Sequence, residues 1–182
     1  MIDSKQATEA LAEIDDIVRR VRQSRIYNLA SLLMIMWGGL VVAGNLASFT
    51  WPRYSGFIWI AVNATGVAGS FAISALTYPR TGVRTFGLRA LIAFVLFFAF
   101  GFTVCALGHF GPRETGTFWA IYFMLVYSIG GLWAGTAFVV IGISISVLTL
   151  IGYFFVGPWF EPWMAVVNGG GLMLGGLWMR RS

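Results

Sequence analysis

The side chains of this chain that could take part in chemistry are few and lie far apart. The sequence has 182 residues with a single histidine, His109, and only two acids after it, Glu114 and Glu161. Together these three could bind a metal ion, but they lack the close ligand spacing of zinc sites, such as HExxH. We therefore predict no metal and no cofactor, and we expect the two acids to pair with Arg53 and Arg113.

Catalytic arrangements are equally scarce. The apolar runs contain no Asp, so a Ser–His–Asp arrangement cannot form within them, and no phosphate-binding glycine loop is present. The only cysteine, Cys105, lies in an apolar run and has no partner for an intrachain disulfide. Short charged segments of mixed sign do not favour nucleic-acid binding. We therefore predict that the protein is not an enzyme and binds no nucleic acid.

Polar side chains at similar depths are the better candidates for a ligand site. Asn45, Asn63 and Asn168 each lie within an apolar run close to its outer end, and Tyr122 occupies a similar place. These four side chains could line a shallow outer pocket. Alternatively, they could hydrogen-bond to each other and lock the helix bundle, which typically contributes about 0.6 kcal/mol per contact in membranes. Both interpretations stay open, and the second is favoured because such contacts need no ligand.

The elements that must position these residues are membrane helices. The chain is 58% hydrophobic and 10% charged, whereas soluble domains carry about 25% charged residues. A membrane helix needs roughly 20 apolar residues. We therefore predict an all-α polytopic membrane domain over residues 26–182, with six transmembrane helices over about 26–50, 56–78, 90–109, 117–137, 137–156 and 160–179.

A repeated motif joins these apolar runs. Residues 52–59 read PRYSGFIW and residues 112–119 read PRETGTFW, and a looser copy, GPWFEPW, covers 157–163. Each copy lies between two apolar runs, so we predict three hairpins with a proline in each outer turn. The first two copies share four residue types, at Pro52, Arg53, Gly56 and Trp59 and at Pro112, Arg113, Gly116 and Trp119.

Glycines mark two further features of the predicted spans. Gly131 and Gly135 form a GxxxG pair, and the step at 135–137 is the predicted turn between the fourth and fifth spans. The run at 169–171 permits two interpretations. It could unwind the last span, as in transporters, or it could form a flat face for close helix contact, which is favoured.

The first 25 residues form a separate predicted unit, a cytoplasmic amphipathic helix. Leu11, Ile14, Val18 and Val21 recur at three- and four-residue spacing, which places one apolar stripe along a helix over 4–24. This helix could lie on the membrane surface with its arginines near lipid phosphates. It could instead dock a protein partner or a second protomer. Both interpretations stay open, and the surface helix is favoured.

Orientation follows from the Lys and Arg residues of short loops. Ten of the twelve lie in the N-terminal segment, in the predicted loop at 79–89 or at the C-terminus. Only Arg53 and Arg113 lie in the other turns. We therefore predict that both termini are cytoplasmic. The outer turns hold five of the eight tryptophans, as expected at a membrane interface, at Trp51, Trp59, Trp119, Trp159 and Trp163.

The three-hairpin plan resembles the short-repeat membrane family typified by the acid-resistance protein HdeD. The residues that carry the resemblance are a proline in each outer turn with glycines on the flanking helices, namely Gly44, Pro52 and Gly66, then Pro112 and Gly130, then Gly152, Pro158 and Gly171. The resemblance implies a stress-associated protein of the bacterial inner membrane that is not an enzyme. It carries over no functional residue.

Two functions agree with these observations. The favoured one is a non-enzymatic membrane protein that acts by association with lipid, with itself as a homo-oligomer, or with a partner that docks on residues 4–24. The alternative is a small channel or transporter for a neutral or weakly charged solute, with an outer pocket lined by asparagines.

Overall fold

The computed structural model describes residues 4–81 and 88–180, and it leaves the side chains of 4–12, 15–26, 78–81 and 88–90 undescribed. The described chain is helical and contains no strand. This confirms the predicted all-α class. The elements are α1 (Ser4–Thr50), η1 (Pro52–Tyr54), α2 (Ser55–Thr81), α3 (Leu88–Leu107), α4 (Pro112–Ala134), α5 (Thr136–Phe155), η2 (Gly157–Trp159), α6 (Phe160–Met164), η3 (Ala165–Gly170) and α7 (Gly171–Met179).

In the described part of the chain, four helical segments are long and apolar enough to cross a membrane: Tyr27–Thr50, Pro52–Thr77, Pro112–Ala134 and Thr136–Phe155. The other two expected spans differ from these in length or continuity. The apolar part of α3, Leu91–Leu107, is shorter. The last span is divided into α6, a π-helix (η3) and α7, with 5, 6 and 9 residues.

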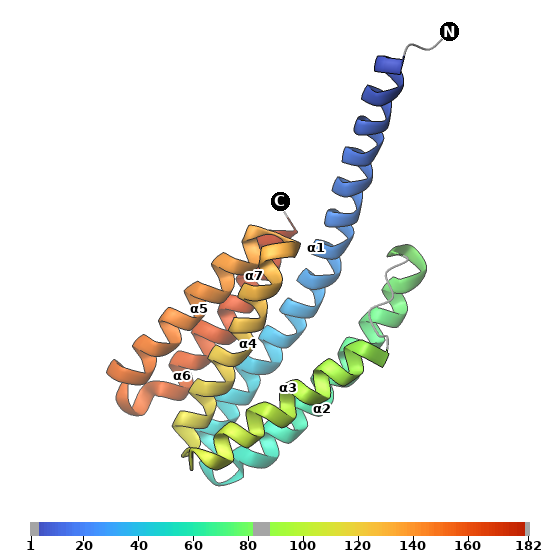
Figure 1. Ribbon diagram of the computed structural model, residues 1–182. Coiled ribbons are helices and arrows are strands. Elements are labelled where there is room, and N and C mark those ends of the chain that lie inside the picture. The colour runs from blue at the N-terminus through green and yellow to red at the C-terminus, as the bar shows by residue number, and fades with distance from the viewer. Residues whose placement is uncertain (1–3, 82–87, 181–182) are drawn as a thin grey trace.

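Helix α1 does not stop where the N-terminal unit was expected to end. It runs for 47 residues, or about 70 Å at 1.5 Å per residue. The sequence has neither Pro nor Gly before Gly38, so nothing in this stretch favours a helix end. The segment 4–25 and the first span are therefore one helix, and Figure 1 shows its N-terminal part projecting past the ends of α4, α5 and α7.

The connections between helices are short. Gly135 alone joins α4 to α5 and has a φ of 141°, which favours glycine. This agrees with the turn expected at 135–137, and it places Gly135 in the turn rather than on a helix face beside Gly131. Helix α2 extends to Thr81 and includes Pro79, so the predicted loop at 79–89 is shorter than expected. The remainder of that loop, 82–87, lies outside the described residues.

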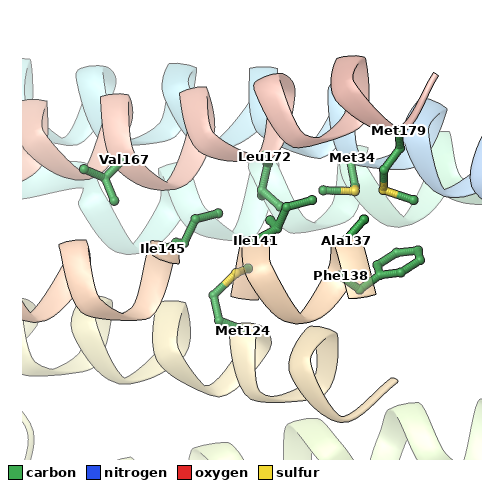
Figure 2. Close-up of a cluster of buried hydrophobic side chains, with 9 residues drawn as sticks. All are labelled: Met34, Met124, Ala137, Phe138, Ile141, Ile145, Val167, Leu172 and Met179. Carbon is green, nitrogen blue, oxygen red and sulfur yellow. The ribbon is translucent and has the colours of Figure 1, made fainter. Parts of the chain in front are cut away.

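The core lies among α1, α4, α5, η3 and α7 (Figure 2). Helix α5 supplies four of its side chains and forms the centre of the cluster. Glycines let the helices approach closely: a Cβ added at Gly169 would lie 2.8 Å from the Gly38 carbonyl oxygen of α1. The nine buried residues of the cluster are Met34, Met124, Ala137, Phe138, Ile141, Ile145, Val167, Leu172 and Met179.

Candidate functional site

The three proline-containing connections lie at the end of the molecule opposite both termini (Figure 1). A proline occupies the first turn of each helix that follows, at Pro52 of η1, Pro112 of α4 and Pro158 of η2. Backbone N–H groups in the first turn of a helix have no intrahelical partner, so the missing N–H of proline costs no hydrogen bond at this position. The same sequence motif nevertheless takes two backbone forms, because residues 52–54 form a 3₁₀ turn and residues 112–114 begin an α-helix directly.

The tryptophan of each motif copy packs against a glycine of the preceding helix. Trp59 lies over Gly44 of α1, and a Cβ added at Gly44 would lie 3.4 Å from its ring. A Cβ added at Gly101 of α3 would lie 2.5 Å from the ring of Trp119. Trp163 lies in the same way against Gly152 of α5 and donates its indole N–H to the Leu148 carbonyl at 2.9 Å. The glycines of the motif itself, Gly56 and Gly116, face open space.

The two motif arginines have different environments. Arg53 is exposed. Arg113 is half-buried, and its guanidinium donates to the carbonyl oxygens of Tyr153 at 2.7 Å and of Gly152 at 3.3 Å. These carbonyls belong to the last turn of α5, which carries the negative end of the helix dipole. Arg113 therefore joins the start of α4 to the end of α5.

Two rings and one acid complete the surroundings of Arg113. Its guanidinium carbon lies 4.8 Å from the ring centre of Phe160 and 5.5 Å from that of Tyr153. Glu161, in the first turn of α6, is half-buried and lies within electrostatic range of Arg113. The buried Nε of Arg113 has no hydrogen-bond partner in the described part of the chain.

The asparagines of the first two helices are held by their own helices. Asn45 is buried and donates to the Val41 carbonyl at 2.8 Å. Asn63 is half-buried and donates to the Trp59 carbonyl at 2.8 Å. Each bond satisfies one of the two amide N–H groups without a ligand.

Tyr122 belongs to an aromatic cluster that joins α3 to α4. Its ring stacks on that of Phe97 with centres 4.1 Å apart and planes 3° from parallel, and its hydroxyl donates to the Phe97 carbonyl at 3.3 Å. Most rings of the cluster come from these two helices, at Phe97, Phe98 and Phe102 of α3 and Phe118, Trp119, Tyr122 and Phe123 of α4, and Phe110 of the connection between them packs on Phe118.

Asn168 lies on the π-helical segment η3 and is buried. Its amide donates to the hydroxyl of Thr149 at 3.1 Å, and it lies 3.3 Å from the sulfur of Met164. Thr149, on α5, has no exposed surface. The glycine run that follows is helical rather than unwound, and Gly169 packs closely against α1, as the favoured interpretation of that run predicts.

The four polar candidates therefore have separate partners on separate helices. The hydrogen bonds of Asn45 and Asn63 stay within one helix, while those of Tyr122 and Asn168 reach a neighbouring helix. Only Tyr122 and Asn168 therefore link neighbouring helices, and none of these four bonds joins one candidate to another. A shared outer pocket stays a prediction.

The metal candidates do not form a cluster. His109 is exposed in the turn before α4, with a φ of 48°. Glu114 is exposed, and a Cβ added at Gly111 would lie 2.6 Å from its carboxylate oxygen. Among the side chains that the structure describes, no three of His, Cys, Asp or Glu gather in a way that could hold a metal.

Sequence reasoning missed several residues that join the helices. Ser31 donates to the Gly176 carbonyl at 2.6 Å and links α1 to α7. Trp37 donates to the Ser70 hydroxyl at 3.0 Å and links α1 to α2. Single small polar residues in apolar runs give little signal. The recurrence of a Gly on one helix and a Trp on the next could have indicated the hairpin contacts.

Comparisons with protein-family models, with curated proteins and with solved structures found no match to this chain. The resemblance to the short-repeat membrane family therefore rests on the residues of the sequence alone.

Proposed function

We propose that this is a non-enzymatic protein of the bacterial inner membrane, with six spans, that acts by association. Both termini lie in the cytoplasm, because ten of twelve Lys and Arg residues lie in the segments at that end. The arrangement of the three outer connections at one end and both termini at the other supports this orientation.

The third and sixth of the proposed six spans are α3 and the divided helix α6–η3–α7. Side chains along α3 are apolar and face outward, as lipid contact requires: Leu96 and Phe100 are each 63% exposed and Leu107 is 77% exposed. The Trp-on-Gly contact in each of the three hairpins supports the interpretation of the chain as a threefold internal repeat.

The single observation that carries association is the continuity of α1. A helix that lay in the plane of the membrane would have to bend where it enters the first span. Instead, α1 continues from Ser4 to Thr50 and projects beyond the bundle. The bundle then serves as an anchor, and the projecting segment presents its apolar stripe to a partner in the cytoplasm.

The test uses the full chain with the stripe made polar. The variant Ile14→Ser with Val18→Ser is compared with the wild type and with a control, Asp16→Ser with Gln23→Ser, on the opposite side of the helix. Membranes are dissolved in mild detergent and the complexes are separated by native electrophoresis. Association predicts that only the stripe variant loses its high-mass complex. A complex of unchanged mass in the stripe variant would reject the proposal.

A solute pathway is the second candidate, and the observation that favours it is the π-helical turn at Asn168. Such turns break the regular α-helix and often occur at functional sites. A pathway lined by Asn45, Asn63 and Asn168 predicts that Asn63→Leu cuts the flux of a neutral solute into proteoliposomes while the protein stays folded. Unchanged flux would reject this lining.

A further inference from the structure

We propose that the projecting part of α1 pairs with the same segment of a second copy of this chain, as a parallel coiled coil on the side of the termini. This inference rests on the proposed function, association, and names the partner.

The spacing of the stripe is that of a coiled coil. Positions 11, 14, 18 and 21 are separated by three, four and three residues, which is the a–d spacing of two successive heptads. Ala10 and Ile17 occupy the g positions beside the seam and widen it. The next a position is Arg25, so the apolar seam ends close to the point where α1 joins the bundle.

The projecting segment needs a partner for physical reasons. Most helical stability in proteins comes from packing of an apolar face rather than from helix propensity. Figure 1 shows that this end of α1 extends beyond the other helices of the chain. Ile14, in the middle of the stripe, is 55% exposed. A second helix along the stripe would cover it.

The membrane favours a second copy over an unrelated helix. Copies of one chain insert in the same orientation, so their α1 helices project in parallel from one side. Their first spans lie at the same depth in the membrane, so identical residues of the two copies lie at the same height. Confinement to one surface also raises the effective concentration of one segment around the other.

At the e and g positions beside the seam, charges do not oppose this pairing; Arg25 meets its counterpart only at the a position where the seam ends. In a parallel pair, each g position faces the e position five residues later on the other helix. Ala10 then faces Asp15, and Ile17 faces Arg22. No two like charges meet across these flanking positions.

The test is disulfide cross-linking in native membranes. The only natural cysteine, Cys105, is first replaced by alanine in the full chain. Leu11→Cys and Val21→Cys then place single thiols at the two ends of the seam, and Asp16→Cys at an f position is the control. After mild oxidation, we expect each seam variant to form at least about ten times more linked dimer than the control.

The position of the thiols decides the orientation. In an antiparallel pair centred on the stripe, the two copies of position 11 would lie at opposite ends, and so would the two copies of position 21. Cross-linking of both variants therefore requires the parallel pair. Equal, low cross-linking of seam and control variants would overturn the inference.

Failure of the coiled-coil inference can be distinguished from failure of the proposed function, association. Loss of the high-mass complex in the polar stripe variant, together with no seam cross-link, would leave association standing with a different protein as partner. Retention of that complex would reject association.

Discussion

Replacement of Arg113 by glutamine should destabilise the bundle far more than the same replacement of Arg53. The two arginines occupy the same place in the repeated motif, so sequence alone treats them as equivalent. Arg113 is half-buried, and its guanidinium donates hydrogen bonds to carbonyl oxygens in the last turn of α5, whereas Arg53 is exposed. Arg53→Gln is therefore a matched control.

The magnitude follows from the contacts of Arg113. The bond to the Tyr153 carbonyl is short, at 2.7 Å, and a hydrogen bond from a charged donor typically contributes about 1.5–3 kcal/mol. The ring of Phe160 lies 4.8 Å from the guanidinium, and such a contact adds about 0.5–1 kcal/mol. The longer bond to Gly152 is left out of the sum. The expected loss is about 2–4 kcal/mol for Arg113→Gln, against less than about 0.5 kcal/mol for Arg53→Gln.

The assay is equilibrium unfolding of each variant in mixed micelles with increasing denaturing detergent, followed by tryptophan fluorescence. Arg113→Lys is a useful third variant, because it keeps the charge but loses the planar fork. Its loss should lie between those of the other two. Equal losses for Arg113→Gln and Arg53→Gln would refute the role of Arg113 as a link between α4 and α5.

Two further changes should also alter stability. Gly169→Ala should cost about 1–3 kcal/mol of unfolding free energy through overpacking, whereas Gly170→Ala, which faces open space, should be neutral in the same assay. His109→Gly should stabilise by about 1 kcal/mol, because φ at this position is 48°; no gain would argue against backbone strain in the turn.

Much of the fold could be predicted because membrane helices depend mainly on local composition. The apolar runs between residue 26 and residue 156 predicted helices that the structure contains, and Gly135 marked a turn that only glycine readily forms. The end of the N-terminal unit was not predictable from amphipathicity. A change from polar to apolar neighbours does not break a helix when neither Pro nor Gly is present.

The site was less predictable because it depends on contacts between distant segments. The repeat placed Arg53 and Arg113 in equivalent positions, yet only tertiary packing brought the end of α5 within reach of Arg113. Similarly, Asn168 could be recognised as a buried polar group, but its partner Thr149 lies 19 positions away on another helix. The π-helical turn that carries Asn168 has no signal in composition.

The mass of the intact assembly tests association between copies of this chain through α1 most directly. Native mass spectrometry of the full-length protein, extracted in mild detergent, should give a whole-number multiple of the chain mass with no other protein bound. The full-length variant Ile14→Ser with Val18→Ser should give the mass of one chain. A single-chain mass for the wild type, or the same assembly in both proteins, would contradict association through α1.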